Sequence, residues 1–369
     1  MRIKTITCHD VYNYGASLQA YALQHYLQSQ GHKVKIIDYT PNYLRNQYKF
    51  WFVPKKSRYY QKAMKNPLLR FMLCCYFAPR RFSTYGRKKK FDAFKRNFLQ
   101  LTNRYVTYQA LVDSPPDADI YIAGSDQIWN SALPNGRDAA YFLHFGSNKI
   151  KRISYAASFG ISIIANEFKE LNSKWLKMFD AISVREHTGL SILASMNINS
   201  GVEVLDPVYL LSLKQWREFA GEKPIIKDPY ILVYDLYLND SRMRLEAERL
   251  SEKFHLKIVS IDGLLKCQYA EKNISNAGPK EFVNLIAYAD YVITNSFHGT
   301  SFSLILNRRF AVYYKYDNIS RIANILNHLE LSRCLNVEQP DYNFCWEEIN
   351  NRLRKMIAFS YEYLSENLN

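Results

Sequence analysis

The sequence predicts an α/β protein built from two Rossmann-like domains. Its 369 residues are enough for two ordinary cores, and 48% of them are hydrophobic. Strand-like and helix-like segments alternate from the start of the chain, and the alternation begins again at Tyr230. Such alternation is typical of parallel sheets covered by helices. We therefore expect a first domain over 1–215, a second over 225–340, and C-terminal helices over 341–369 that can pack back on the first domain.

The first domain is predicted to open with a strand, a helix and a second strand. Residues 2–8 are strand-like, 16–27 carry apolar residues at helical spacing, and 34–39 are rich in β-branched residues. The loop before the helix contains Gly15 but no G-x-G-x-x-G motif, so the sequence does not indicate a dinucleotide site. Gly15 marks either a tight turn or a loop that contacts a ligand.

Polar side chains follow the strand predicted over 119–123. Ligands bind beyond the carboxyl ends of parallel strands, so Asp126 is well placed to orient a sugar hydroxyl or to accept its proton. Trp129 could stack on a sugar ring, and it could equally be a half-buried loop tryptophan. Both residues are candidates for the part of a site that holds a hydroxyl-bearing substrate.

An arginine stands at the end of the strand predicted over 181–184. Arg185 can hold a carboxylate or a phosphate through two parallel hydrogen bonds, which lysine cannot do. The alternative is a salt bridge to Glu186 or to another neighbour. The charged stretch 221–224 then marks the linker to the second domain.

The segment 289–303 predicts a strand, a turn and a helix around His298. Ser296 is a typical helix N-cap residue, and the residues after Thr300 suit a buried helix. The free N–H groups at such a helix start suit an anion, and Gly299 lets backbone approach the ligand closely. His298 can donate a proton or a charged hydrogen bond there, or it can simply cap the helix.

The net charge of +15 is concentrated in one segment. Residues 45–96 contain 16 Lys and Arg and a single acid, Asp92, so this segment carries +15 and the remainder sums to zero. Aromatic residues lie between its charges, and an apolar run lies over 68–77. Three interpretations are open: a segment that lies on an anionic membrane surface, a nucleic-acid groove, or a solvated helical hairpin. We expect the membrane surface as the partner and no nucleic acid.

The cysteines and the N-terminus bear on location. The six cysteines form no C-x-x-C pair and no Cys/His metal spacing, so we expect no metal site and a reduced cytoplasmic protein. The N-terminus is too strand-like for a signal peptide, and no uncharged apolar run approaches the ~20 residues of a membrane-spanning helix. We expect a cytoplasmic protein, at most peripheral at the inner face of the cell membrane.

Several blocks of the sequence, in this order along the chain, resemble the polysaccharide pyruvyl transferase family. The block with the most chemistry is 295–300, preceded by 279–283 and 289–293. The resemblance runs from about residue 3 to about residue 335, apart from the region near 45–100. The remaining matching blocks are 13–19, 124–130, 155–160, 183–186 and 205–207.

The resemblance implies a GT-B-like architecture, in which two Rossmann-like domains face a cleft and the basic, aromatic-rich segment 45–100 is an insertion in the first domain. It also implies transfer of pyruvate from phosphoenolpyruvate, the donor substrate, to two hydroxyls of one sugar, with release of phosphate. The product is a cyclic pyruvate ketal. The expected partners are phosphoenolpyruvate and a saccharide of a bacterial surface polysaccharide, expected to be lipid-linked, and no cofactor or metal is required.

By the family's pattern, three residues are expected to be catalytic. His298 is the general acid or a phosphate ligand, Arg185 clamps the carboxylate or phosphate of the donor, and Asp126 is the base on the acceptor side. A further basic residue is expected after the helix, and the sequence does not choose between two candidates. We expect donor binding by Arg185, Ser296, His298, Gly299, Thr300, Lys315 and Arg321, and acceptor binding by Asn13, Tyr14, Gly15, Ser125, Asp126 and Trp129.

Two other functions are open at this point. One is a GT-B-type glycosyltransferase with a nucleotide-sugar donor, although no segment indicates a nucleobase pocket. The other is a non-catalytic protein that binds a membrane or nucleic acid through 45–96. The first shares the architecture of a pyruvyl transferase and differs only in the donor, so the fold cannot separate the two.

Overall fold

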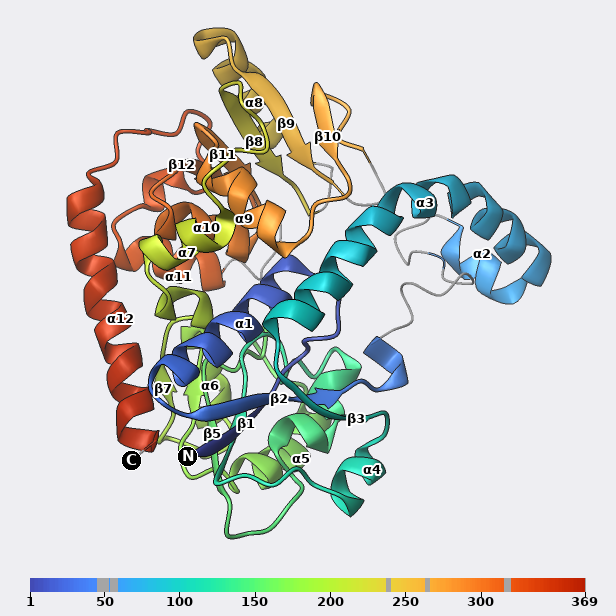
Figure 1. Cartoon of the computed structure of the whole chain (residues 1–369), viewed down its shortest axis with the longest axis vertical. Coiled ribbons are helices and arrows are strands. Elements are labelled where there is room, and N and C mark those ends of the chain that lie inside the picture. Colours follow the sequence, from blue (N-terminus) through green and yellow to red (C-terminus); the bar gives the residue numbers. More distant parts are fainter. Residues whose placement is uncertain (45–52, 54–58, 237–239, 263–265, 315–319, 369) are drawn as a thin grey trace.

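The computed structural model describes residues 1–44, 53, 59–236, 240–262, 266–314 and 320–368 (Figure 1). Within these residues the chain forms two lobes, each a parallel sheet with helices packed around it. The first lobe carries β1 to β7, and the second lobe carries β8 to β12. This architecture confirms the predicted α/β fold of two Rossmann-like domains.

The first lobe has a five-stranded parallel sheet in the order β3-β2-β1-β4-β5. Parallel bridges from Ile153 to Ala181 and from Ala157 to Val184 connect this sheet to the short pair of β6 and β7. The strands are β1 (Arg2–Ile6), β2 (Lys33–Tyr39), β3 (Leu101–Tyr105), β4 (Ile120–Ala123), β5 (Lys151–Ser154), β6 (Ser183–Val184) and β7 (Val202–Glu203). The helices are α1 (Tyr14–Ser29), α4 (Tyr108–Asp113), α5 (Asn166–Leu176) and α6 (His187–Ala194).

The second lobe repeats this arrangement, with the strand order β10-β9-β8-β11-β12, and α7 (Leu213–Ala220) leads into it. All of its neighbouring strands pair in parallel. The strands are β8 (Tyr230–Tyr234), β9 (Lys257–Ile261), β10 (Lys272–Ile274), β11 (Tyr291–Thr294) and β12 (Arg309–Val312). The helices are α8 (Ser241–Phe254), α9 (Pro279–Ala287), α10 (Phe297–Ile305) and α11 (Ser320–His328).

Both sheets reverse their strand order at one point, between β1 and β4 in the first lobe and between β8 and β11 in the second. Ligands of open α/β sheets bind beyond the carboxyl ends of the strands at such a switch point. Asp126 follows β4, and His298 follows β11. The topology therefore places both residues where a ligand is expected.

The two lobes touch through the start of α1. The Tyr14 ring stacks on Phe282 of α9, with 4.5 Å between the ring centres, and its hydroxyl donates to the carbonyl of Ala277 at 3.0 Å. Tyr14 and Phe282 belong to one apolar core that extends across both lobes. The amino end of α1 is thus fixed against the second lobe.

The C-terminal helix α12 (Trp346–Leu368) returns from the second lobe and packs on the first (Figure 1). The Tyr363 hydroxyl donates to the carbonyl of Ser154 at 2.8 Å, and the Ser360 hydroxyl oxygen accepts from the N–H of Leu205 at 3.0 Å. Leu364 is buried in the first-lobe core. We expected C-terminal helices over 341–369, and the described part of that segment contains the single helix α12.

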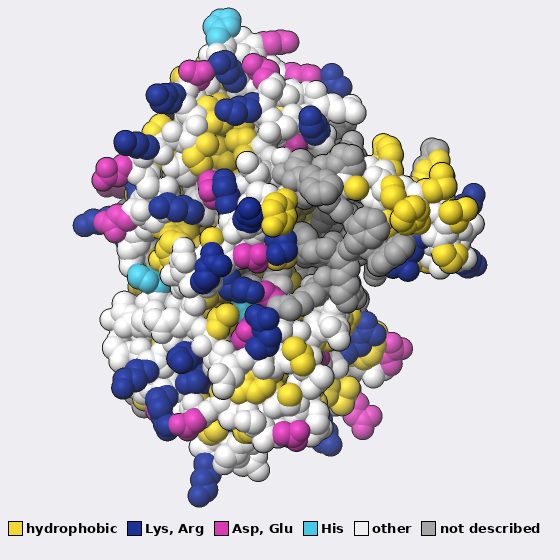
Figure 2. All heavy atoms as spheres, turned by 45° about the vertical axis from the view of Figure 1, so that its right-hand side comes forward, with side chains coloured by type: hydrophobic (Ala, Val, Ile, Leu, Met, Phe, Trp, Pro, Cys, Tyr) yellow, Lys and Arg dark blue, Asp and Glu magenta, His cyan; other side chains and the backbone are white. Residues whose placement is uncertain are grey.

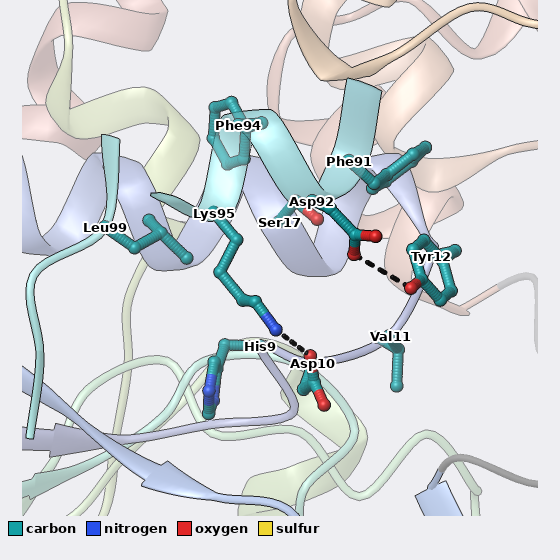
Figure 3. Close-up of a pocket in the computed structure, with 10 residues that line it drawn as sticks. All are labelled: His9, Asp10, Val11, Tyr12, Ser17, Phe91, Asp92, Phe94, Lys95 and Leu99. Carbon is teal, nitrogen blue, oxygen red and sulfur yellow. Dashed lines mark hydrogen bonds and ion pairs between the residues drawn. The ribbon is translucent and has the colours of Figure 1, made fainter. Parts of the chain in front are cut away.

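The basic insertion contains α2 (Tyr60–Lys65) and the long helix α3 (Pro67–Phe98). The carboxyl half of α3 is tied to the loop between β1 and α1, where Lys95 pairs with Asp10 and the Tyr12 hydroxyl donates to Asp92 at 2.9 Å (Figure 3). Its other half and α2 project from the body as a hairpin (Figure 1). Within the described residues of the insertion, the contacts of α3 with the two lobes thus lie in its carboxyl half.

The described part of the chain lacks two kinds of feature, a membrane-spanning helix and a metal-binding cluster. No helix in it combines the length and the apolar character needed to cross a membrane. The same part of the chain contains no group of His, Cys, Asp and Glu side chains arranged to hold a metal ion.

Candidate active site

Arg185 of the first lobe and His298 of the second lobe meet at one buried carboxylate. Arg185 directly follows β6, and its Nη1 donates to Oδ2 of Asp206 at 2.7 Å. His298 lies in the first turn of α10, and its Nε2 is 3.6 Å from the same oxygen. The Asp206 side chain has no exposed surface. The site therefore joins an arginine of the first lobe and a histidine of the second lobe around a carboxylate that water does not reach.

Asp206 is oriented by its own stretch of chain. Its Oδ1 accepts a hydrogen bond from the N–H of Val208 at 3.1 Å, which makes it the cap of the 3-10 turn Pro207–Leu210. A proline at the first position of such a turn suits this cap, because it lacks the N–H that would need a partner. Local structure thus fixes one oxygen and leaves the other to Arg185 and His298.

The Arg185 guanidinium keeps unused hydrogen-bond donors. Nη2 lies 3.7 Å from Oδ1 of Asp126, and Nε lies 3.8 Å from Oε2 of Glu186. Both nitrogens are buried, and neither has a hydrogen-bond partner among the residues that the structure describes. An unpaired buried donor costs about 1–3 kcal/mol. This corner of the site therefore favours an added acceptor such as an oxyanion.

Glu186 holds the loop that follows β5. Its Oε1 accepts hydrogen bonds from the Ser158 hydroxyl and from the N–H groups of Phe159 and Gly160, at 2.8 to 3.1 Å. Its distance from Arg185 is longer, at 3.8 Å. Arg185 does form a salt bridge, as the alternative prediction stated. Its short ion pair, however, is with Asp206 and not with Glu186.

A second arginine lies beside the first. The guanidinium carbon of Arg321 is 5.9 Å from the centre of the Phe297 ring, and that of Arg185 is 4.9 Å from the same centre. Arg321 lies in the first turn of α11 and forms no hydrogen bond or ion pair with a described residue. Lys315, the other candidate for this cation, lies outside the described residues. The guanidinium groups of Arg185 and Arg321 thus both lie near the Phe297 ring, and both have N–H groups without a hydrogen-bond partner among the described residues.

The charges of the site act on one another. Burial would raise the pKa of Asp206, but His298 and Arg185 outweigh burial and hold that pKa below its usual range. Burial and repulsion from Arg185 lower the pKa of Arg321, while nearby carboxylates act in the other direction. An anion placed between the two arginines would relieve this repulsion. The electrostatics therefore favour a small anionic ligand.

Gly15 packs against the ring of His298. A Cβ atom added to Gly15 would lie 2.0 Å from Nδ1 and 2.3 Å from Cε1 of the imidazole, closer than real atoms approach. Gly15 belongs to the first turn of α1 and does not form a tight turn, which was one of the two interpretations of this glycine in the sequence. Its missing side chain leaves room for the histidine of the other lobe.

The other predicted donor-binding residues build the start of α10. The Ser296 hydroxyl oxygen accepts from the N–H of Gly299 at 3.3 Å, and the Thr300 hydroxyl donates to the Ser296 carbonyl at 3.0 Å. A Cβ on Gly299 would lie 2.5 Å from Oγ1 of Thr294, so glycine lets the helix begin close to β11. These groups hold His298 in place, and direct contact between them and a donor stays a prediction.

Three of the predicted acceptor-binding residues have structural partners. The Asn13 side chain caps α1 by accepting from the N–H of Ala16 at 3.2 Å. Tyr14 is buried in the contact between the lobes. Ser125 is fully buried, and its hydroxyl donates to the carbonyl of Ala156 at 2.6 Å. These residues shape the loops around the site, and their contact with an acceptor stays a prediction.

Trp129 corrects one expectation. Its side chain has no exposed surface, and its Nε1 donates to the carbonyl of Tyr141 at 3.0 Å. Its ring stacks on Phe142 with 5.6 Å between the ring centres. A ring that is enclosed on all sides cannot stack on a sugar, so Trp129 is a core residue of the first lobe.

Asp126 does face the site. It follows β4 in a left-handed backbone conformation with φ of 72°, which is uncommon for a residue other than glycine. Its side chain is 22% exposed, and Oδ1 lies 3.7 Å from Nη2 of Arg185. Asp126 thus combines a position beside the cationic pair with an accessible carboxylate, as a base for a substrate hydroxyl requires.

Nothing in the sequence assigned a role to Asp206 or Phe297. The available signal for Asp206 was the aspartate-proline pair in the block 205–207, since Asp is a preferred cap before a turn that starts with proline. No spacing rule connects this cap with Arg185 or His298. The contact depends on how the two lobes pack, which local sequence patterns do not contain.

The structure is similar in fold to solved structures of other proteins. A putative UDP-N-acetylglucosamine 2-epimerase from Listeria monocytogenes aligns with a TM-score of 0.54 and 9% identity over 97% of this chain and 88% of that chain. MnaA of S. aureus, solved with UDP, aligns with a TM-score of 0.51 and 11% identity over 96% and 88%. At such identities the likeness shows the fold alone, the GT-B-like pair of Rossmann-like domains. No curated protein matches the sequence.

The sequence itself matches a family model. The model for polysaccharide pyruvyl transferase covers residues 13–318, which is most of the chain. The matched span contains Asp126, Arg185, Asp206 and His298, the residues that the fold brings to one place. The chain therefore belongs to the polysaccharide pyruvyl transferase family.

Proposed function

We propose that this protein transfers pyruvate from phosphoenolpyruvate to two hydroxyls of one sugar, which forms a cyclic pyruvate ketal and releases phosphate. Membership of the family makes it a transferase with a saccharide acceptor. The observation that supports the donor is the pair of Arg185 and Arg321, whose guanidinium groups meet one aromatic ring with donors to spare. Phosphoenolpyruvate carries a carboxylate and a phosphate, the two groups that arginine binds best.

The two arginines suit the two ends of the donor. Arg185 already uses Nη1 on Asp206, so it has Nε and Nη2 left for the carboxylate. Arg321 has no ion pair with a described residue, so its charge is available for the phosphate. The departing phosphate develops the larger negative charge, and a cation aimed at that charge stabilises the transition state.

The reaction requires a proton at carbon and two sugar hydroxyls. Protonation of the methylene carbon of phosphoenolpyruvate produces an oxocarbenium-like centre at the neighbouring carbon, which the first hydroxyl attacks. The bond from this carbon to the phosphate oxygen then breaks, and the second hydroxyl closes the ring. The two hydroxyls lose one proton each, which balances the protons gained by the methylene carbon and by the phosphate.

His298 is the proposed acid and Asp126 the proposed base. The imidazole of His298 lies between Asp206, which is 3.6 Å from Nε2, and the amino end of α1, which Nδ1 faces, and we assign the proton delivered to carbon to this ring. Asp126 stands at the carboxyl end of β4 and can take the proton of the attacking hydroxyl. Because acid and base come from different lobes, the reacting carbon and hydroxyl are held between the lobes.

The proposed acceptor is a sugar of a bacterial surface polysaccharide carried on a lipid. The enzyme would then work at the cytoplasmic face of the membrane as a peripheral protein. The saccharide acceptor of the family and the basic insertion support this location. No step of the proposed reaction requires a metal or a cofactor, because arginine side chains neutralise the phosphate.

Incubation of the purified protein with phosphoenolpyruvate and candidate glycans tests the function. Phosphate release that requires both substrates and equals the ketal formed would support the proposal. UDP-sugars are the comparison donors, because the S. aureus neighbour was solved with UDP. Turnover of a UDP-sugar without turnover of phosphoenolpyruvate would instead establish a glycosyltransferase.

Substitution of the three cationic residues should change different kinetic constants. We expect Arg185→Ala and His298→Ala each to lower kcat at least ~100-fold, because a charge-stabilising group or the proton donor is lost. Arg321→Ala should mainly raise KM for phosphoenolpyruvate, by roughly 10-fold or more. Arg244→Ala, on the exposed face of α8, is the control. Near-normal turnover in Arg185→Ala or His298→Ala would remove that residue from the mechanism.

Gly15→Ala should lower kcat, because the single methyl group that it adds collides with His298. The added Cβ would overlap Nδ1 of His298, so the imidazole must leave its place beside Asp206. We expect a loss of roughly 10- to 100-fold in kcat with the fold retained. Gly86→Ala is the control, because a Cβ there meets no atom closer than 3.4 Å. Equal activity of the two variants would show that the His298 position does not matter.

Asp206→Asn should lower kcat more than it raises KM, because Asp206 positions Arg185 and His298 without touching substrate. We expect a loss of at least ~10-fold in kcat, together with a stability loss of about 3 kcal/mol for the broken buried pair. Asp38→Asn is the matched control, since Asp38 is also a buried carboxylate between His9 at 3.0 Å and Arg104 at 2.9 Å. Asp38→Asn should lose stability and keep its kcat.

The pH dependence of unfolding tests whether the carboxylates of Asp38 and Asp206 are charged in the folded protein. Burial raises the pKa of Asp38, but His9 and Arg104 outweigh burial and lower it to about 2. Because this folded value lies below the unfolded value of ~3.9, the contribution is present above that value and is lost as the pH falls towards 2. Asp206 shifts in the same direction. Urea unfolding of the wild type and both variants between pH 7 and about 3 should therefore show smaller differences at the acid end.

A further inference from the structure

We propose that the tip of the α2–α3 hairpin, residues 59–76, docks on an anionic lipid bilayer. The hairpin tip stands away from both lobes, and Figure 2 shows hydrophobic side chains gathered on this projection. The inference extends the proposed membrane location to a defined surface. It concerns binding alone, so it can hold or fail independently of the transfer reaction.

Large apolar side chains follow one face of the helix at the hairpin tip. Leu68, Met72 and Tyr76 are 69%, 60% and 68% exposed, and their spacing of four residues places them on the same side of α3. Met64 of α2 adds a further side chain at 41% exposure. An apolar strip of this kind on a soluble surface marks an interaction site.

The exposed strip is not needed for the fold of the hairpin. Val53, Ala63 and Cys74 form a small buried cluster of their own, with Leu69 and Leu73 packed against it. This cluster is separate from the cores of the two lobes. The residues that hold the hairpin together thus point inward, while the strip points to solvent.

The tip presents exposed lysines in a stretch of the chain that has no acidic residue. No acidic residue lies between Asp38 and Asp92, and Lys62 and Lys65 are exposed beside the apolar strip. Towards the lobes, three of the four lysines of α3 have acidic partners: Lys88 with Asp92 at 2.7 Å, Lys90 with Glu281 at 2.9 Å, and Lys95 with Asp10. Basic residues held near an anionic leaflet contribute about 1 kcal/mol each. The tip therefore combines exposed lysines with apolar side chains.

A lipid surface fits this combination better than other partners. Leucine and methionine can enter the boundary of the acyl chains, whereas a single-stranded nucleic acid is bound mainly by basic residues and by aromatic rings that stack on its bases. A second copy of the chain offers no net negative charge, because residues outside 45–96 sum to zero. An anionic bilayer supplies both the charge and the apolar layer.

The hairpin that carries the tip is connected to the candidate site. Further along α3, Arg87 donates to the carbonyl of Tyr12 at 3.2 Å, and Tyr12 lies in the loop that leads to Gly15, which packs against His298. The same helix contacts α9 of the second lobe through Lys90 and Glu281. The helix α3 thus extends from the proposed lipid contact to the loop before α1.

Co-sedimentation with vesicles tests the docking surface. The full chain is mixed with phosphatidylcholine vesicles that contain phosphatidylglycerol and with pure phosphatidylcholine vesicles. We expect binding to the anionic vesicles that weakens as salt is raised, because surface charges are screened. Leu68→Ser/Met72→Ser should reduce this partitioning at least ~10-fold. Ile163→Ser/Leu245→Ser is the matched control, since these two side chains are 81% and 65% exposed on the body.

Each other outcome would overturn the proposal. Equal losses in the tip variant and the control variant would show that the strip has no special part in binding. Binding of pure phosphatidylcholine at the same strength would contradict the role of charge. Dimers in solution that the tip variant abolishes would assign the strip to a second copy of the chain. Tighter binding to single-stranded RNA than to anionic vesicles would assign it to nucleic acid.

Discussion

The carboxylate of Asp206 is the interaction on which the active site depends. A buried aspartate, wholly shielded from water, is stable only with partners, and Asp206 takes them from both lobes: Arg185 at 2.7 Å and His298 at 3.6 Å. Its second oxygen is tied to the backbone of Val208. The side chains proposed for donor binding and proton transfer are therefore positioned by a residue whose own side chain has no exposed surface.

Close packing between the lobes adds a second constraint. The imidazole of His298 fits only because residue 15 has no side chain, and the neighbouring Tyr14 ring lies flat on Phe282. Such contacts leave little freedom for the start of α1 relative to α10. Rearrangement of this loop would therefore displace His298, the proposed acid, from its place beside Asp206.

Sequence patterns predicted the two sheets, but they did not predict which side chains become buried or which contacts form between the lobes. Buried parallel strands such as β8 and β11 are continuous apolar runs, and the alternation with helices follows from their topology. The switch points then placed Asp126 and His298 correctly at strand ends. Burial was harder to predict: Trp129 lies in a polar block, yet it is enclosed by side chains distant in sequence. The role of Asp206 likewise depends on the packing of two lobes, which no local periodicity encodes.

The balance of charge explains why a small acid is a suitable ligand for this site. Three carboxylates, Asp126, Glu186 and Asp206, surround Arg185, whereas Arg321 has no ion pair with a described residue. The site therefore has opposite charges close together, and also a repulsion between its two guanidinium groups that Glu186 and Asp126 offset in part. A ligand with a carboxylate and a phosphate would place negative charge between the two guanidinium groups and relieve that repulsion. In the proposed reaction this ligand is the donor, so the cations that would bind it also face the charge that develops on the departing phosphate.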